Sequence, residues 1–457
     1  MSTRATESTP AIRPLAGSDP AADPGAVVTG ATWRITVLHD GLFRVEWSDD
    51  GGFEDRASTF AIRRRLAVPD YLVKRIDGGV EITTARARLQ YDGRPFSARG
   101  LSVETRGRGG HRWRYGENTG NLGGTGRTLD DVDGRMPLEP GVLSRDGVAV
   151  LDDSDSFVFD RSGWIATRVP GRRDICIFAY GEDFDDALRA YYDVSGTPSL
   201  LPRWALGNWW SRYHRYTDAA YVELMDRFAV DGLPFSVAVV DMDWHHVDSV
   251  PPRFGTGWTG YSWNRELFPD PAAFLGQLHR RNLRVALNLH PADGVRAFED
   301  QYRAMAGALG RNPDSEEPIA FDPVDPAFLR AYFEVLHHPL EAQGVDFWWI
   351  DWQQGQSSRI PGVDPLWILN HFHYLDSSRS GAPGMTFSRY AGPGSHRYAV
   401  GFSGDAVISW ASLAFQPEFT ATAANIGYAW WSHDIGGHIN GVRDDDLATR
   451  WVQFGAF

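Results

Sequence analysis

The run Asp346-Phe-Trp-Trp-Ile-Asp351 is apolar between its two aspartates and is typical of a buried β-strand. Similar runs recur along the second half of the chain. Segments with apolar residues at helical spacing separate them, such as 217–230, 271–281 and 326–343. Continuous apolar strands that alternate with helices predict a parallel sheet buried on both faces. The seven predicted strands are 205–210, 236–241, 284–290, 346–351, 385–389, 399–403 and 428–433.

This series predicts an α/β fold, a (β/α)8 barrel of the TIM type over residues 199–457. Such a barrel needs eight strands, one more than the pattern supplies. The sequence ends on a helical segment, 450–457, that would lead into the eighth strand. Because a seven-stranded open barrel leaves an unpaired edge, we expect the barrel to be C-terminally incomplete and the chain to be a truncated piece of a longer protein.

The first part of the chain has a different rhythm. Runs such as Trp33-Arg-Ile-Thr-Val-Leu and Val80-Glu-Ile-Thr-Thr-Ala alternate with period two and are separated by Asp-Gly and Gly-Gly turns. They predict an N-terminal antiparallel β-sandwich domain over residues 28–198. Residues 1–27, rich in Ala, Pro, Ser, Thr, Gly and Asp, are predicted to be a disordered tail. The glycine-rich stretch 115–126 lacks the Gly-Lys-Ser/Thr ending of a phosphate loop, so we expect a mobile surface loop there.

Composition excludes several classes of function. The 457 residues include 45 Lys and Arg against 59 Asp and Glu, a net charge of −14, which disfavours nucleic acid and anionic membranes as partners. The single cysteine, Cys176, excludes an intrachain disulfide and cysteine-rich zinc or iron–sulfur sites. No apolar run is long enough for a membrane span, and the N-terminus lacks the apolar core of a secretory signal. We therefore expect a cytoplasmic protein.

Aromatic residues make up 13% of the chain, with 18 tryptophans, which indicates either a large aromatic core or a cleft lined by flat rings. Active groups of such barrels lie at the carboxyl ends of the strands. Here four of the seven strands deliver a carboxylate to that edge, beside several tryptophans. A single aspartate there would be an ordinary helix cap, but four favour a site. The residues at these ends are Asp241, Asp243, His290, Asp351, Arg389, Asp405, His433 and Asp434.

Carboxylates packed among aromatic rings can differ in pKa, because burial raises one and a neighbouring Arg lowers another. Two carboxyl groups so separated can act as acid and nucleophile, which splitting a glycosidic bond requires. A metal-dependent reaction is the rival interpretation, but His371-Phe-His373 lies on a predicted helix, and the adjacent histidines of 245–246 and 337–338 cannot face one point. We expect no metal and no cofactor.

At these residues the sequence resembles glycoside hydrolase family 31. Phe347-Trp-Trp-Ile-Asp351 is similar to the family's Trp-x-Asp nucleophile strand, and Phe402-Ser-Gly-Asp405 to its Trp-x-Gly-Asp acid/base motif, with Phe in place of Trp. Four further elements occur in the family's order and extend the resemblance from about residue 30 to the end. They are Tyr115-Gly-Glu117, Val240-Asp241-Met-Asp243, Ser388-Arg389 and His433-Asp434-Ile-Gly-Gly437.

The resemblance implies a retaining α-glycosidase of the α-glucosidase or α-xylosidase type. Asp351 would be the catalytic nucleophile and Asp405 the acid/base, with their carboxyl groups ~5–5.5 Å apart. The implied substrate is a carbohydrate, and no cofactor is implied; the sequence is silent on oligomeric state. The implied substrate-binding residues are Asp241, Trp349, Arg389, Phe402, His433 and Asp434.

Several alternatives stay open at this point. Asp241 could only cap a helix, Asp434 could only form a turn, and Arg389 could pair with Asp405 merely to neutralise a buried charge. Trp352-Gln-Gln-Gly355 stands where typical α-glucosidases have Met-Asn-Glu, which indicates a different pocket beyond the nucleophile. The alternative functions are an α-galactosidase or α-N-acetylgalactosaminidase, a transglycosylase, or a catalytically inactive carbohydrate-binding protein.

Overall fold

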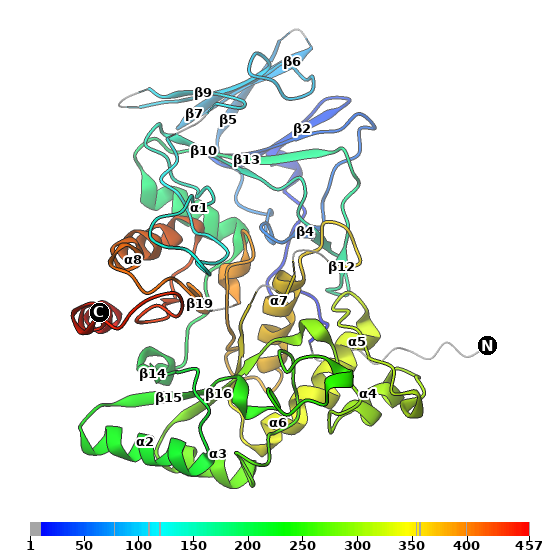
Figure 1. The fold of residues 1–457 in the computed structure, drawn as a ribbon. Coiled ribbons are helices and arrows are strands. Elements are labelled where there is room, and N and C mark those ends of the chain that lie inside the picture. Colours follow the sequence, from blue (N-terminus) through cyan, green and yellow to red (C-terminus); the bar gives the residue numbers. More distant parts are fainter. Residues whose placement is uncertain are drawn as a thin grey trace.

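The computed structural model describes residues 11–76, 78–107, 110–117, 120–352, 354–355, 358–398 and 400–456. Antiparallel sheets gather at one end of the molecule, and a curled parallel sheet with its helices forms the other (Figure 1). This arrangement is an α/β fold with additional sheet domains. Among the described residues, none of the helices combines the length and apolar character needed to cross a bilayer.

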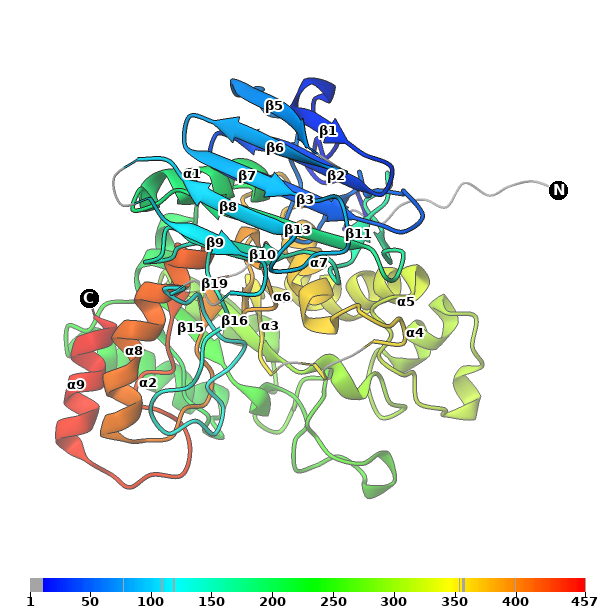
Figure 2. The ribbon, with the colours of Figure 1, turned by 90° about the horizontal axis from the view of Figure 1, so that it is seen from above.

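The N-terminal region contains two five-stranded antiparallel sheets, whose strands lie side by side in Figure 2. Their apolar faces form one buried cluster that includes Trp33, Phe43, Ile82 and Trp113. A small third sheet joins β4 (Ala57–Ser58), β11 (Val158–Phe159) and β12 (Ile165–Ala166). The first five-stranded sheet has the order β1 (Val27–Thr29), β2 (Trp33–His39), β3 (Leu42–Trp47), β13 (Arg173–Ala179) and β10 (Val148–Asp152). The second has the order β5 (Tyr71–Ile76), β6 (Gly79–Thr84), β7 (Ala87–Tyr91), β8 (Leu101–Thr105) and β9 (Arg112–Arg114).

The parallel sheet has seven strands, which are neighbours in chain order. Each of the seven apolar runs picked out in the sequence contains or overlaps one of them. Parallel pairing in chain order brings all the carboxyl ends to one edge, as in a TIM barrel. The strands are β14 (Asn208–Trp210), β15 (Phe235–Val240), β16 (Arg284–Leu289), β17 (Phe347–Ile350), β18 (Phe387–Ser388), β19 (Val400–Phe402) and β20 (Trp431–Ser432).

Helices flank this sheet, and polar side chains begin most of them. Thr217, Asp270 and Ser409, for example, each accept a hydrogen bond from a backbone N–H in the first turn. The segment predicted as one helix over 326–343 is divided by a π-helical stretch, Tyr332–His337, between α5 and α6. The helices are α1 (Phe184–Ser195), α2 (Asp218–Val230), α3 (Pro271–Arg280), α4 (Tyr302–Ala308), α5 (Pro326–Ala331), α6 (His338–Gln343), α7 (Pro365–Ser377), α8 (Trp410–Ala423) and α9 (Asp445–Gly455).

The prediction of a disordered tail over 1–27 is wrong for the part that the structure describes; residues 1–10 lie outside it. Ala11 is fully buried, and Arg13 donates a hydrogen bond to the carbonyl of Leu375 at the end of α7. The backbone N–H of Arg64 donates to Asp19. Composition failed here because a few apolar side chains and backbone hydrogen bonds are enough to fix a short segment against an existing core.

The glycine-rich stretch also differs from the prediction of a mobile loop. Residues 118 and 119 lie outside the described residues, but the backbone N–H groups of Leu122 and Gly124 donate to the carbonyls of Leu143 and Glu139. Thr125 is fully buried. This anchored stretch leads directly into residues 127–131, which reach the carboxyl edge of the parallel sheet.

A buried ionic network holds the first antiparallel sheet together. Arg44 on β3 is 1% exposed and donates two hydrogen bonds to Asp174 on β13, at 2.8 and 2.6 Å. Arg168 bridges Asp174 and Asp153 at 3.0 and 2.7 Å. Burial alone would raise the pKa of Asp174, but the Arg44 guanidinium holds it well below its usual value. The Arg44 charge therefore stabilises the ionised form of Asp174 in this core.

Replacing Arg44 by Met should destabilise the fold strongly, because it keeps most of the side-chain volume but removes one of the two guanidinium partners of the buried Asp174. Removing one partner of a buried pair costs about 3–5 kcal/mol. Urea unfolding followed by circular dichroism measures this loss. The matched control is Arg189→Met, which breaks a pair with Asp186 whose Arg side chain is 71% exposed, and should change the unfolding midpoint far less. Equal effects of the two substitutions would contradict a structural role for the network.

Candidate active site

Four carboxylates meet at the carboxyl edge of the parallel sheet. Asp241 directly follows β15, Asp351 follows β17, Asp405 lies three residues after β19, and Asp434 lies two residues after β20. The charge of Asp351 shifts the pKa of each of the other three, so the group forms one electrostatic unit. The parallel topology thus brings the four predicted carboxylates to one site.

Asp351 is held as an anion. Its Oδ1 accepts hydrogen bonds from Arg389 Nη2 at 2.7 Å and from the backbone N–H of Trp352 at 2.8 Å. Nε2 of His290 and Nδ2 of Asn288 both lie 3.3 Å from Oδ2. Burial would raise the pKa of Asp351, but Arg389 and His290 together hold it far below its usual value. A buried, ionised carboxylate with fixed orientation is suited to act as a nucleophile.

Asp405 is shifted in the opposite direction. Burial raises its pKa, and the negative charges of Asp351 and Asp130 raise it further, against the opposing effects of His438 and Arg389. A carboxyl group that keeps its proton beside an ionised neighbour has the properties of a general acid. The pKa values of the two carboxyl groups are therefore shifted in opposite directions for identifiable physical reasons.

The remaining two carboxyl groups are also biased toward the neutral form. Burial and the charge of Asp351 raise the pKa of Asp241 to about 7. Burial and the charge of Asp405 raise the pKa of Asp434 well above its usual value. Asp241 accepts a hydrogen bond from the backbone N–H of Met242 at 2.7 Å, so it also caps the short 3-10 helix η3 (Met242–Trp244). The capping alternative for Asp241 is thus correct in part, without removing it from the site.

Arg389, at the end of β18, is the cation of the site. It is 1% exposed, and its Nη1 donates to Asp130 at 2.6 Å and to Thr128, while Nη2 donates to Asp351. Its pairing is therefore with Asp351 and Asp130, not with Asp405 as the structural alternative supposed. The guanidinium carbon lies 4.7 Å from the centre of the Phe402 ring.

Trp349 and Phe402 pack against each other inside the barrel, with ring centres 5.9 Å apart. They are 6% and 1% exposed, so both rings are buried, and Phe402 lies against the Arg389 guanidinium. The structure does not bring His433 to the group. Its Nε2 lies 2.7 Å from the Thr420 hydroxyl on α8, and its ring packs on Phe454 of α9. Adjacent residues after a strand point in different directions, which is why Asp434 joins the site and His433 does not.

Sequence reasoning assigned no role to several residues of the site. His290 was recognised at a strand end but not as a partner of Asp351, and Asn288 lies two residues before it on β16. Thr128 and Asp130 come from the N-terminal half of the chain, 259 to 261 residues before Arg389. Only the position of His290 at a strand end offered a signal.

An exposed aromatic corner stands beside Asp351. Trp258 is 38% exposed and its ring centre lies 4.2 Å from that of His290. The Trp352 ring is perpendicular to the Trp258 ring, with ring centres 6.0 Å apart. Trp352 and Gln354 both adopt left-handed backbone conformations, with φ of 43° and 58°, which are strained for residues with side chains. Gln353, part of the predicted departure from the α-glucosidase pattern, lies outside the described residues.

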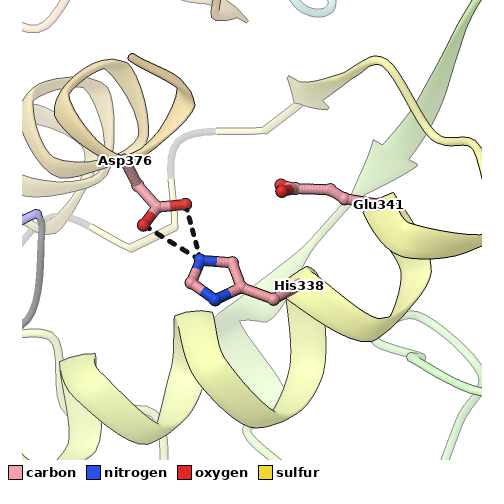
Figure 3. A group of neighbouring side chains, drawn as sticks. All are labelled: His338, Glu341 and Asp376. Atoms are coloured by element: carbon pink, nitrogen blue, oxygen red, sulfur yellow. Dashed lines mark hydrogen bonds and ion pairs between the residues drawn. The ribbon is translucent and has the colours of Figure 1, made fainter. Parts of the chain in front are cut away.

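One further cluster has residue types that can bind a metal. His338 and Glu341 on α6 face Asp376 on α7, as Figure 3 shows. The His338 Nε2 lies 3.0 Å from both Asp376 oxygens, and Arg379 donates to both Asp376 and Glu341. The carboxylate oxygens are already engaged, and the Arg379 charge would repel a cation. The cluster is best described as an ionic link between two helices.

Comparison with known proteins identifies the family of the barrel region. Residues 198–457 match the family model described as "Glycosyl hydrolases family 31 TIM-barrel domain". An α-xylosidase of Saccharolobus solfataricus is 24% identical over 307 residues, covering 61% of this chain and 40% of the relative. An α-glucosidase of the same organism is 27% identical over 310 residues, covering 56% and 43%. The chain thus spans about 40% of the length of these curated relatives.

Solved structures share the fold. A family 31 α-xylosidase from a soil metagenome, solved with xylose, superposes with a TM-score of 0.68 at 16% identity, over 94% of this chain and 75% of that one. A Flavobacterium johnsoniae dextranase, solved with glucose, gives 0.67 at 17% identity, over 94% and 62%. The family model covers more than half of the chain. The protein therefore belongs to glycoside hydrolase family 31.

Proposed function

We propose that this protein is a retaining α-glycosidase that hydrolyses O-glycosidic bonds of α-glucoside-type substrates through a covalent glycosyl-enzyme. The observation that carries the proposal is the opposite protonation bias of two neighbouring carboxyl groups, Asp351 below and Asp405 above the usual pKa. A retaining glycosidase needs one carboxylate as nucleophile and one carboxylic acid as proton donor. Membership of the family supports the same assignment.

In the first step, a carboxylate oxygen of Asp351 attacks the anomeric carbon and forms an ester as the bond to the leaving oxygen breaks. Asp405 gives its proton to that leaving oxygen, which departs as an alcohol. In the second step, Asp405, now ionised, takes a proton from water, and the resulting hydroxide oxygen bonds to the anomeric carbon. The Asp351 ester bond breaks, which restores both groups and retains the anomeric configuration.

The other residues of the site would bind the sugar. Asp241 and Asp434 offer carboxyl oxygens that can accept hydrogen bonds from sugar hydroxyls. Arg389 would hydrogen-bond the sugar while it keeps Asp351 ionised. Trp349 packs on Phe402 and Phe402 on Arg389, so these buried rings would hold Arg389 in place on the side away from the sugar. We do not assign His433 to the sugar, because its ring is engaged with α8 and α9.

The relatives support an α-linked glucose or xylose at the bond that is cleaved. They include α-glucosidases, α-xylosidases and a dextranase. Glucose and xylose present the same ring hydroxyls and differ in the C6 hydroxymethyl group. Transfer to a sugar hydroxyl in place of water would use the same covalent intermediate and remains within the same proposal of mechanism.

The direct test is a panel of nitrophenyl α-glycosides given to the full-length protein. We expect turnover of the α-glucoside or α-xyloside and little turnover of the α-galactoside, the α-N-acetylgalactosaminide and the β-glucoside. Proton NMR of the first product should show the α anomer before mutarotation, as retention requires. Release of the β anomer would contradict the covalent mechanism, and binding of oligosaccharide without turnover would favour the inactive binding protein.

Asp351→Asn should lower kcat on the best nitrophenyl glycoside by about 10³-fold or more, because the amide cannot form the glycosyl ester. Steady-state kinetics with purified proteins measure this. Asp248→Asn is the control, since that carboxylate lies on the loop after β15 but is 78% exposed and pairs only loosely with Arg215. Activity of Asp351→Asn within about tenfold of the parent would show that the nucleophile has been wrongly assigned.

His290→Phe should move the acidic limb of the pH profile of kcat/KM to higher pH by about one unit. His290 stabilises the ionised form of Asp351, so its loss raises the pKa of that carboxyl, which then becomes protonated at higher pH as pH falls. The phenyl ring preserves the contact with Trp258. The control is His279→Phe, which breaks a His–Asp pair at 2.8 Å outside the site. An acidic limb that stays in place would rule out this role for His290.

A further inference from the structure

A short segment of the N-terminal region runs alongside the chain that carries Asp405. The backbone N–H of Leu129 donates to the carbonyl of Ser403 at 2.8 Å, and that of Asp131 donates to the carbonyl of Asp405 at 3.1 Å. Asp130, between them, is therefore fixed against residues 403–405. The anchored glycine-rich stretch described above delivers this segment to the site.

The Asp130 carboxylate bonds to the group that holds Asp351 and to the backbone of Asp405. Its Oδ1 accepts a hydrogen bond from Arg389 Nη1 at 2.6 Å and another from the backbone N–H of Asp405 at 2.8 Å. The other guanidinium nitrogen of Arg389 holds Asp351 at 2.7 Å. A continuous chain of hydrogen bonds thus runs from Asp351 through Arg389 and Asp130 to Asp405.

Gly404 lies directly against this contact and leaves no room for a side chain. Its φ is +87°, and a Cβ atom there would lie 1.9 Å from Arg389 Nη1 and 2.5 Å from Asp130 Oδ1. Neither partner can move easily, because Arg389 is buried and Asp130 is held through its backbone neighbours. The close approach of three chain segments at Gly404 requires a residue without a side chain.

We propose that Asp130 is a positioning residue of this active site, which fixes Arg389 and the backbone of Asp405 in one geometry and so sets Asp351 and Asp405 relative to each other. The inference rests on the proposed function, since it assigns to Asp130 a part in the same reaction. By this proposal, residues of the N-terminal region and of the barrel together set the geometry of the catalytic centre.

The charge of Asp130 also favours the protonated form of Asp405. It raises the pKa of both Asp405 and Asp434, and the groups that face Asp405 are Asp351, Asp434, Asp130, Asp241, His438 and Arg389. Asp130 also pairs with Arg389, whose positive charge acts to lower the pKa of Asp405.

Asp130→Asn tests the proposal, because the amide oxygen can still accept both hydrogen bonds while the charge is lost. We expect kcat/KM at the optimum to fall by about 10-fold to 10²-fold in Asp130→Ala, which removes the acceptor, and by less in Asp130→Asn. We also expect the basic limb of the pH profile to move to lower pH by about one unit, since the pKa of Asp405 falls when a neighbouring negative charge is removed. The unfolding midpoint should change little.

The matched control is Asp131→Asn. Asp131 is the next residue, is exposed, and has a φ of 60°, which asparagine adopts readily. This substitution removes the same charge one position away and keeps the backbone bond to Asp405. It should leave the basic limb in place. A basic limb that does not move in Asp130→Asn, or that moves equally in both variants, would overturn the proposal.

A second measurement separates failure of this inference from failure of the proposed function. Asp130→Ala removes the acceptor of the Asp405 N–H, so amide hydrogen exchange of the peptide containing residues 403–405 should become faster. Exchange is read without turnover. The exchange result therefore decides whether Asp130 fixes this segment even if the parent chain hydrolyses no α-glycoside, and unchanged exchange would refute that role.

Discussion

One buried guanidinium organises this molecule's catalytic centre. Arg389 lies at the mouth of the curled sheet and donates in two directions, to Asp351 within the barrel and to Asp130 from the N-terminal region. Without it, Asp351 would lose the partner that contributes most to its ionised form, and burial would raise its pKa. With Arg389 in place, the pKa of Asp351 is lowered while those of Asp405 and its neighbours are raised, and such a difference is what an acid and a nucleophile require.

The cost of this arrangement is visible in the surrounding structure. Asp241, Asp405 and Asp434 all have pKa values raised by burial and by neighbouring charge, which means that ionising them in the folded protein is unfavourable. In the Arg44 network each buried carboxylate has a guanidinium partner, which lowers the pKa of Asp174, although burial still raises that of Asp153. Direct guanidinium pairs thus decide which buried carboxyl groups of this chain ionise most easily.

Local sequence pattern predicted the parts of the structure that depend on local physics. The strands follow from continuous apolar runs, and the edge at which Asp351 and Asp405 meet follows from parallel topology. The pattern failed where distant segments decide the outcome. Asp130 reaches Arg389 across 259 positions, and residues 11–27 are fixed by a core that composition does not reveal. His433 failed for a different reason, since strand periodicity ends at Ser432 and no longer determines which way the next side chain points.

The turn after Asp351 has a strained backbone at Trp352 and Gln354. A tryptophan and a glutamine in left-handed backbone conformations each cost about 1–3 kcal/mol, and the Gln354 amide, which donates to the carbonyls of Asp351 and Trp352, is among the contacts that oppose relaxation. The backbone of this turn is strained, and local hydrogen bonds hold it in that conformation. Heating would release it before the barrel core melts, so the temperature at which catalysis is lost would lie below the temperature at which the protein unfolds.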